Sequence, residues 1–264
     1  MVTVNPLGQS GFRFVAGSTI FYVDPYLSDA VERKHGPQFS RQVPLPMSPT
    51  QVTDANLVMI SHGHTDHCDP ITIATIAMQS PQAIFICTYE SVPILEKAGV
   101  AANKIQLVTE PLTPLTKDIS YAAIPAAHPT LERDSQGRLR RCGFLLHFEN
   151  CLVYHAGDTS PHVEIFRALE GAEIDYAFLP VNEKNFFRDQ KDIIGNMSVR
   201  EAFHFAEKIG AKRLVPMHFD MFAPNSVFPE EIELLYEKLQ PAFKLEFLWP
   251  GKEYALNSAL EMVH

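Results

Sequence analysis

The stretch "SHGHTDHCDP", residues 61–70, gathers His62, His64, Asp66 and His67 within six positions. It follows the apolar run "LVMIS", residues 57–61, whose composition predicts a buried strand. His62 and His64 are two residues apart, so in extended backbone their side chains point the same way and can bind one ion. The chain then turns into a helix opened by Pro70, and the turn directs Asp66 and His67 toward a second position. A chance match to this pattern is on the order of one in a thousand, so the stretch predicts a metal site.

Further candidate ligands follow other predicted strands. His128 comes after "ISYAAI", Asp158 after "CLVYHA" and His218 after "RLVPM". A divalent ion needs four or more donor atoms, and a pair of ions needs a carboxylate that can bridge them. The inventory therefore predicts two ions with Asp158 between them, the first bound by His62, His64 and His128 and the second by Asp66, His67 and His218.

Two kinds of residue around these ligands are expected to support the chemistry. Asp24, at the end of the predicted strand "TIFYVD", is expected to hold a ligating imidazole in place by a hydrogen bond. Asp66 and Asp158 are the candidate catalytic carboxylates, because two bound ions activate a water for attack and a nearby group must then accept its proton. Imidazole and carboxylate donors suit manganese, zinc or iron, and ligand type alone does not choose among them.

Short β-branched and aromatic runs alternate with helical patterns along the chain. Strands are predicted near 12–16, 19–24, 57–61, 83–88, 119–124, 143–148, 151–156, 176–181, 213–218 and 244–249. Helices are predicted at 70–79, 91–98, 162–170, 198–209 and 229–239, where proline, serine and glycine mark the ends. This order predicts an α+β fold in which two sheets pack together and helices lie outside. The long segments 27–50 and 182–197 are interpreted as functional loops.

Composition limits the classes of function. The 264 residues are enough for one large domain or two closely joined halves, and 46% of them are hydrophobic. A formal net charge of −9 argues against binding to nucleic acid or to an anionic membrane. Neither a secretion signal nor a run long enough to span a bilayer is evident, so the expected location is the cytoplasm. The four cysteines are scattered and predict neither disulfides nor a cysteine-type zinc site.

Taken together, the ligand pattern resembles the metallo-β-lactamase superfamily. The HxHxDH signature at residues 62–67, the upstream Asp24, His128, the "GDT" aspartate Asp158 and the late His218 stand in the family's order. The resemblance covers nearly the whole chain. It implies a single domain over residues 1–264, a four-layer αββα sandwich and a two-metal site at one edge of the sheets. It also favours Mn²⁺ or Zn²⁺, with iron as an alternative.

Other segments resemble the branch of this superfamily that includes L-ascorbate-6-phosphate lactonase. They are residues 24–42, 125–129, 193–225 and 230–239. This resemblance implies hydrolysis of a sugar lactone, such as L-ascorbate 6-phosphate, by a metal-activated water. Phosphate would be bound by cationic residues, for which the candidates are Arg33, Lys34 and Arg41, or Arg140 and Arg141, and a sugar hydroxyl by Asn182 or Asn196. Surface solvation of the charges and turn formation by the asparagines explain the same residues.

Several functional alternatives stay open at this point. The same centre could cleave a small phosphodiester, or it could bind iron and act as an oxidoreductase. A binding protein that has lost its activity is a third alternative, which the full set of ligands disfavours. The expected partner is a small, phosphorylated or unphosphorylated substrate, with no nucleic acid and no membrane, and the resemblance leaves a homo-oligomer open.

Overall fold

The computed structural model describes residues 2–191 and 193–257, and two seven-stranded sheets dominate it. The first sheet runs, in spatial order, through β14 (Tyr254–Leu256), β1 (Val2–Gly8), β2 (Gly11–Ala16), β3 (Thr19–Val23), β4 (Leu57–Ile60), β5 (Ile84–Cys87) and β6 (Ile105–Leu107). The second runs through β13 (Lys244–Leu245), β12 (Arg213–Met217), β11 (Tyr176–Pro180), β10 (Cys151–His155), β9 (Cys142–Phe148), β8 (Ile119–Pro125) and β7 (Thr113–Pro114).

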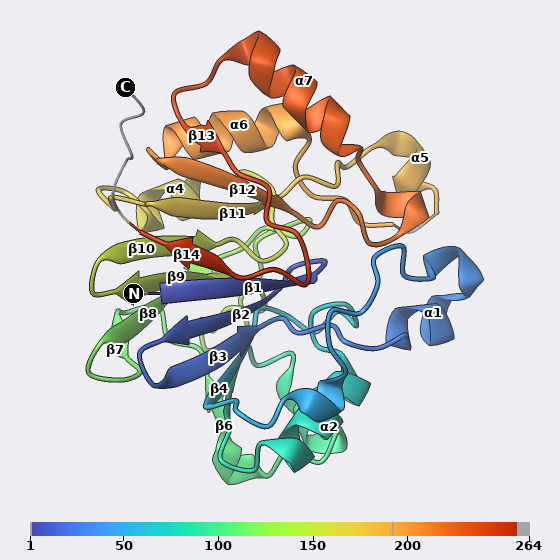
Figure 1. The fold of residues 1–264 in the computed structure, drawn as a ribbon, viewed down its shortest axis with the longest axis vertical. Coiled ribbons are helices and arrows are strands. Elements are labelled where there is room, and N and C mark those ends of the chain that lie inside the picture. Colours follow the sequence, from blue (N-terminus) through green and yellow to red (C-terminus); the bar gives the residue numbers. More distant parts are fainter. Residues whose placement is uncertain (1, 192, 258–264) are drawn as a thin grey trace.

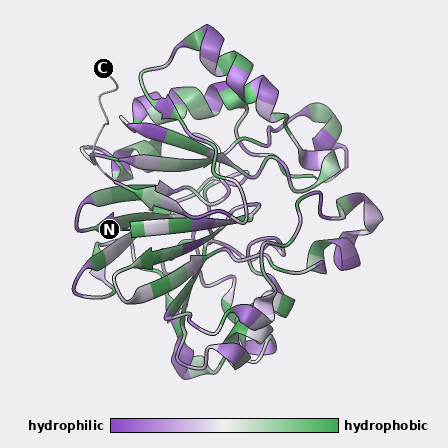
Figure 2. Cartoon of the chain, viewed as in Figure 1, coloured by the Kyte–Doolittle hydropathy of each residue, from purple (hydrophilic) through white to green (hydrophobic). Residues whose placement is uncertain are grey.

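The core lies between the two sheets. Phe14 and Phe21 of the first sheet stack with ring centroids 5.0 Å apart, and Phe148 of the second lies 6.2 Å from Phe14. All three are buried, and they belong to one cluster that both sheets contribute to. Figure 2 shows that many residues of the strands in both sheets are hydrophobic. Burial of these side chains drives the two sheets together, since alternate residues of a strand face the same side.

Helices cover the outer faces of both sheets, which gives four layers (Figure 1). On the first sheet, α2 (Pro70–Gln79) and α3 (Val92–Lys97) bury Ile73, Ile76 and Leu95 in a separate cluster. On the second sheet lie α4 (Val163–Ala168), α6 (Val199–Lys208) and α7 (Pro229–Leu239). Phe205 of α6 stacks on Tyr154 of β10 at 6.2 Å. The expected α+β, four-layer αββα arrangement is confirmed.

The structure also differs from the sequence-based expectation in several elements. β1 was not predicted, because Pro6 and Gly8 interrupt its pattern, yet it pairs with both β2 and β14. The run at 244–249 was predicted as a full strand, but only its first two residues pair, with β12. The segments 27–50 and 182–197 are not purely loops, since they contain the short helices α1 (Ala30–His35) and α5 (Phe186–Asp189).

The topology of the sheets brings the candidate metal ligands to one edge of the sandwich. β3, β4, β5 and β6 are parallel to one another, and so are β10, β11, β12 and β13. Parallel strands end at the same edge, so residues that follow β3, β4, β10 and β12 emerge close together. Among the described residues, none of the helices has the length and apolar character that crossing a bilayer requires.

Candidate metal centre

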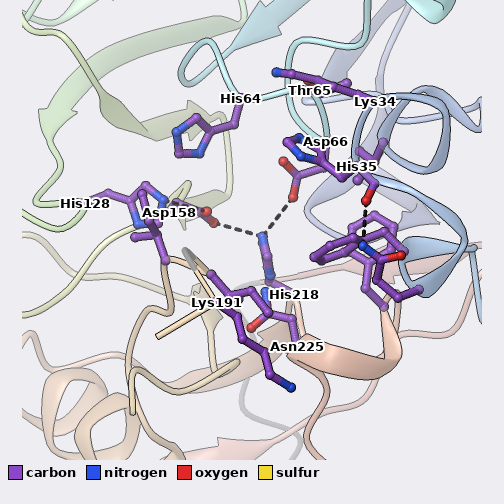
Figure 3. Close-up of a pocket in the computed structure, with 16 residues that line it drawn as sticks. Lys34, His35, His64, Thr65, Asp66, His128, Asp158, Lys191, His218 and Asn225 are labelled. Carbon is purple, nitrogen blue, oxygen red and sulfur yellow. Dashed lines mark hydrogen bonds and ion pairs between the residues drawn. The ribbon is translucent and has the colours of Figure 1, made fainter. Parts of the chain in front are cut away.

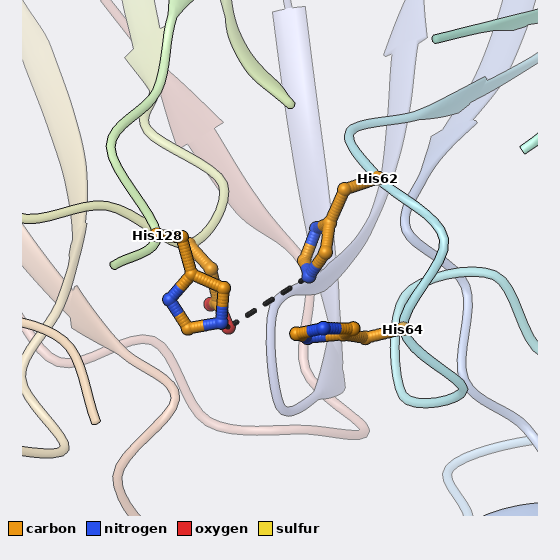
Figure 4. A group of neighbouring side chains, drawn as sticks. His62, His64 and His128 are labelled. Atoms are coloured by element: carbon orange, nitrogen blue, oxygen red, sulfur yellow. Dashed lines mark ion pairs between the residues drawn. The ribbon is translucent and has the colours of Figure 1, made fainter. Parts of the chain in front are cut away.

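Seven histidine and aspartate side chains converge where the strands end, in two groups. His62, His64, His128 and Asp158 form the first group, and Asp66, His67 and His218 form the second. Within each group the candidate ligand atoms all lie within 4.8 Å of one another. Figure 4 shows the three imidazoles of the first group turned toward one another, and Figure 3 shows Asp66, Asp158 and His218 around the cavity. Residues separated by more than 150 positions in the sequence thus lie close together.

Asp158 lies between the two groups and faces both. Its Oδ2 is 3.3 Å from Nε2 of His128 and 4.0 Å from Nε2 of His62. Its Oδ1 is 3.3 Å from Nε2 of His67 and 3.3 Å from Nε2 of His218. One carboxylate oxygen is therefore directed at each group, which is the arrangement that a bridging ligand of two ions needs.

A buried aspartate fixes the imidazole of His67. Asp24 Oδ2 lies 2.8 Å from Nδ1 of His67, and the same carboxylate accepts hydrogen bonds from the backbone N–H and the hydroxyl of Ser61. This contact leaves Nε2 of His67 directed at the site, as in metal centres where a carboxylate orients a ligating histidine. Asp24 also has a positive φ of 44°, and His218 has one of 61°. Backbone strain of this kind persists where the surrounding structure enforces it, which is common at functional sites.

The two groups differ in their proton affinity. In the first group, burial lowers the pKa of His64, lowers that of His128 to about 3 and lowers that of His62 well below its ordinary value. In the second group, burial has the same tendency, but the charges of the aspartates override it. They raise the pKa of His218 to about 9 and that of His67 well above its ordinary value.

Buried polar atoms that lack a hydrogen-bond partner indicate whether these residues fit metal ions. Nε2 of His62, Nε2 of His67 and Oδ1 of Asp158 are buried and have no hydrogen-bond partner among the described residues. Buried polar atoms are rarely left unpaired, and each such atom costs about 1–3 kcal/mol. All three atoms are directed into the centre, and nitrogen and carboxylate oxygen are donors that zinc, manganese and iron accept. The residues therefore fit a pair of divalent ions.

A cavity of about 530 Å³ opens over this centre (Figure 3). Its floor includes His64, Asp66, His128, Asp158 and His218. The wall is partly apolar and partly cationic. It includes Val31, Lys34 and Phe39 of the first long segment, Lys191 and Ile193 of the second, and Phe222 from the chain that follows β12. A volume of this order accommodates a small molecule.

Only one of the predicted substrate-binding residues, Lys34, lines the cavity. Arg33 on α1 is not among the residues that line it, is largely exposed and forms an ion pair with Asp29 at 2.7 Å. Arg41 donates to the backbone carbonyl of Tyr26 at 2.9 Å, and its guanidinium lies over the Tyr26 ring. Both guanidinium groups thus have protein partners where substrate contacts were expected.

The other residues expected to bind substrate are also engaged within the protein. Asn196 donates to the side chain of Asn182 at 2.9 Å, and both residues are buried. Arg140 pairs with Glu90 and Glu132, and buried Arg141 donates to the backbone carbonyl of His128. Arg141 therefore supports the loop that carries a candidate ligand.

Three residues near the centre were not found from the sequence. Lys191 lines the cavity from the second long segment. Ser61 contacts Asp24, and its hydroxyl is 3.0 Å from Nδ1 of His62. Gln9 lies in the connection between β1 and β2 and contacts Asp66 and His218. The only signal for Gln9 was the "GQSG" turn, because strand β1 was itself missed.

Comparison of the sequence with known proteins identifies its family. The family model described as "Beta-lactamase superfamily domain" matches residues 19–219. A UPF0173 metal-dependent hydrolase of Pyrococcus furiosus is 27% identical over 262 residues, covering 97% of this chain and 100% of the relative. A second, from Pyrococcus abyssi, is 29% identical over 264 residues, covering 97% of this chain and 100% of that relative.

A solved structure extends the likeness to the fold. Igni18, a metallo hydrolase from the archaeon Ignicoccus hospitalis, has a TM-score of 0.68 at 20% identity, covering 97% of this chain and 99% of that one. At this identity the likeness shows the shared fold alone. The sequence match spans most of the chain and includes Asp24, the HxHxDH signature, His128, Asp158 and His218. The chain therefore belongs to the beta-lactamase superfamily, among relatives that are named metal-dependent hydrolases.

Proposed function

We propose that this chain is a metal-dependent hydrolase that opens a small lactone carrying an anionic group, such as a phosphorylated sugar lactone. The observation that carries the proposal is the position of Asp158, which directs one carboxylate oxygen at each group of candidate ligands. The names of the relatives support hydrolysis, and the lactone is the substrate class that the sequence resemblance favours.

Each group of residues has a distinct task in this proposal. His62, His64 and His128 hold the first ion, Asp66, His67 and His218 hold the second, and Asp158 bridges them. Bound Mn²⁺ or Zn²⁺ would lower the pKa of a water molecule and polarise the carbonyl oxygen of the substrate. The side chain of Asp66 is 18% exposed against 4% for Asp158, so the Asp66 carboxylate is the one placed to accept a proton from the cavity.

The cavity supports an anionic substrate. Lys34 and Lys191 both line it, in a chain whose formal net charge is −9. Nζ of Lys34 lies 3.1 Å from the hydroxyl of Thr65, which directs the ammonium toward the HxHxDH loop. An ammonium can serve as a point charge for a phosphate or a carboxylate. The lysines therefore take the role that the sequence analysis had also offered to Arg33 and Arg41.

The experiment is a hydrolysis screen with the metal-loaded protein. Sugar lactones, their phosphates and small phosphodiesters would be incubated with added Mn²⁺ or Zn²⁺, and ring opening would be followed by proton release. We expect turnover of a phosphorylated lactone and none with the Asp158→Ala variant. Equal rates for wild-type and variant would refute the proposed centre, and a protein that binds no divalent ion would refute metal-dependent hydrolysis altogether.

A small phosphodiester is the second candidate substrate. The observation that favours it is the same pair of lysines in the wall of the cavity over the centre, because a phosphodiester carries its charge at the bond that is cleaved. Hydrolysis of phosphodiesters but of no lactone in the screen would assign the chain to this activity.

A further inference from the structure

Gln9 is a buried residue whose backbone is tied to the candidate metal centre. It is 4% exposed and lies in the two-residue connection between Gly8 of β1 and Gly11 of β2. Its φ of 57° is in the left-handed region, and its carbonyl oxygen accepts a hydrogen bond from the backbone N–H of His218 at 3.0 Å. Glycine or asparagine is usual at such a turn position. A buried glutamine held there against a conformational cost suggests that its side chain is needed.

The end of the Gln9 side chain reaches the second group of ligands. Its Nε2 lies 2.7 Å from Oδ2 of Asp66 and 3.0 Å from Nε2 of His218. The ligand atoms themselves are spaced similarly, with 3.2 Å between His218 Nε2 and Asp66 Oδ2. Atoms that each lie about 2.1 Å from one ion are about 3.0 Å apart in an octahedral shell and about 3.4 Å apart in a tetrahedral one. The amide of Gln9 therefore lies as far from Asp66 and His218 as two ligands of one ion lie from each other.

The chemistry of the amide favours its oxygen at this position when an ion is bound. A histidine that binds an ion through Nε2 has no lone pair left there, so an N–H of Gln9 would face it without an acceptor. A half-turn of the carboxamide exchanges oxygen and nitrogen while the rest of the side chain stays in place. The oxygen is then directed at the ion, and an amide oxygen is a good ligand for hard divalent cations.

We infer that Gln9 is a further protein ligand of the second ion, through Oε1, beside Asp66, His67, His218 and the bridging Asp158. The inference rests on the proposed two-ion hydrolase site. With Gln9 as a ligand, the two ion sites differ in their donor atoms. The first site has three nitrogens and one oxygen, and the second has two nitrogens and three oxygens. Four donors suit tetrahedral zinc, whereas five oxygen-rich donors suit an ion of higher coordination number such as Mn²⁺.

The test is Mn²⁺ binding by protein that already holds one equivalent of Zn²⁺, followed by the electron paramagnetic resonance signal of free Mn²⁺. Wild-type protein would be compared with Gln9→Leu, Gln9→Glu and the control Gln82→Leu. The Gln82 side chain donates to the backbone carbonyl of Ala55, and Gln82 precedes the start of β5, whereas the candidate ligands follow the ends of strands. We expect Gln9→Leu to weaken Mn²⁺ binding by at least about tenfold with Zn²⁺ binding unchanged. Gln9→Glu should bind Mn²⁺ at least as tightly as wild-type, since it keeps an oxygen at the same place.

Gln9→Glu separates a ligand from a hydrogen-bond donor. If Gln9 only donated to Asp66, a carboxylate in its place would repel Asp66 and weaken binding as much as leucine does, and that result would overturn the inference. Wild-type affinity in Gln9→Leu would also overturn it while leaving the two-ion proposal intact. If wild-type protein took up no ion at either position, the proposed function would fail together with this inference. Should Gln9→Leu lose Zn²⁺ as well through misfolding, the comparison of Gln9→Glu with wild-type decides.

Discussion

At the scale of single residues, the centre depends on buried groups that are costly to leave unpaired. Nε2 of His62, Nε2 of His67 and Oδ1 of Asp158 face one another without hydrogen-bond partners among the described residues. Such a cluster is unfavourable alone and becomes favourable when a cation occupies it, so folding and metal binding are expected to be coupled.

Removal of the bridging carboxylate tests the most central residue. In Asp158→Ala we expect bound metal to fall and hydrolysis to drop by at least about a hundredfold, since even residues that only support ligands are worth 10–100-fold. Metal content would be measured by mass spectrometry and turnover on the substrate found in the screen. Circular dichroism would establish that the variant is folded, and full metal content in a folded variant would exclude Asp158 from bridging.

Metal loading should release protons from the second group of ligands. Because the pKa of His218 is raised to about 9, its imidazole is protonated at pH 7 in the metal-free protein and must lose that proton to bind an ion. We expect on the order of one to two protons released per ion there, with affinity rising as pH increases toward 9. Calorimetry in buffers of different ionisation enthalpy measures this number. Identical heats in all buffers would contradict the prediction.

At the scale of elements, short helices and their ends position the cavity wall. α1 and α5 lie in the two long segments. α6 packs on β11, which leads into the second of these segments, and on β12, which leads to His218. Ser198 begins α6 with a capping box, in which its hydroxyl accepts from the N–H of Glu201 and its own N–H donates to the Glu201 carboxylate.

Loss of this cap should cost stability. Ser198→Ala is expected to lower the free energy of unfolding by about 1 kcal/mol, as is typical for a helix N-cap. Urea denaturation measures the change, and Ser135→Ala, at an exposed turn position, is the control with an expected change within about 0.5 kcal/mol. Equal stability of the two variants would show that the cap contributes nothing.

The proposed role of Lys34 in substrate binding can be tested against Arg33, its neighbour on α1. Lys34 lines the cavity and Arg33 does not, so Lys34→Met should raise the KM for a phosphorylated substrate roughly fivefold, the effect of about 1 kcal/mol of charge attraction. Arg33→Met should leave KM unchanged. Steady-state kinetics on the phosphorylated and unphosphorylated lactones would check this. The same KM shift in both variants would argue against a specific role for Lys34.

At the scale of the whole molecule, the two sheets hold the centre together through the core between them. The first sheet leads into His62, His64, Asp66 and His67, and the second leads into His128, Asp158 and His218. The site therefore exists only when the sheets are packed face to face. A substitution that loosens this core should therefore weaken metal binding even though every candidate ligand is kept.

Phe14, at the middle of this core, tests how much the core between the sheets stabilises the fold. Phe14→Ala removes a ring that stacks on Phe21 and lies beside Phe148, and it should lower the free energy of unfolding by about 3–5 kcal/mol. Phe187→Ala makes the same chemical change at a side chain that is 76% exposed, and a change within about 0.5 kcal/mol is expected. Denaturation of both metal-free variants measures the difference, and a small effect in Phe14→Ala would contradict the assigned core.

The sequence by itself was enough for the α+β architecture, the main helices and the order of the candidate ligands. These features have local signals: hydrophobic periodicity, end residues such as Pro70 and Ser198, and the spacing of His62, His64, Asp66 and His67. Only the tertiary structure decided which other side chains face the centre. Arg33, Arg41, Asn182 and Asn196 turned to protein partners, while Gln9 and Lys191 came to the site from distant turns. The direction of a side chain in an irregular segment depends on contacts far along the chain, and no local pattern records them.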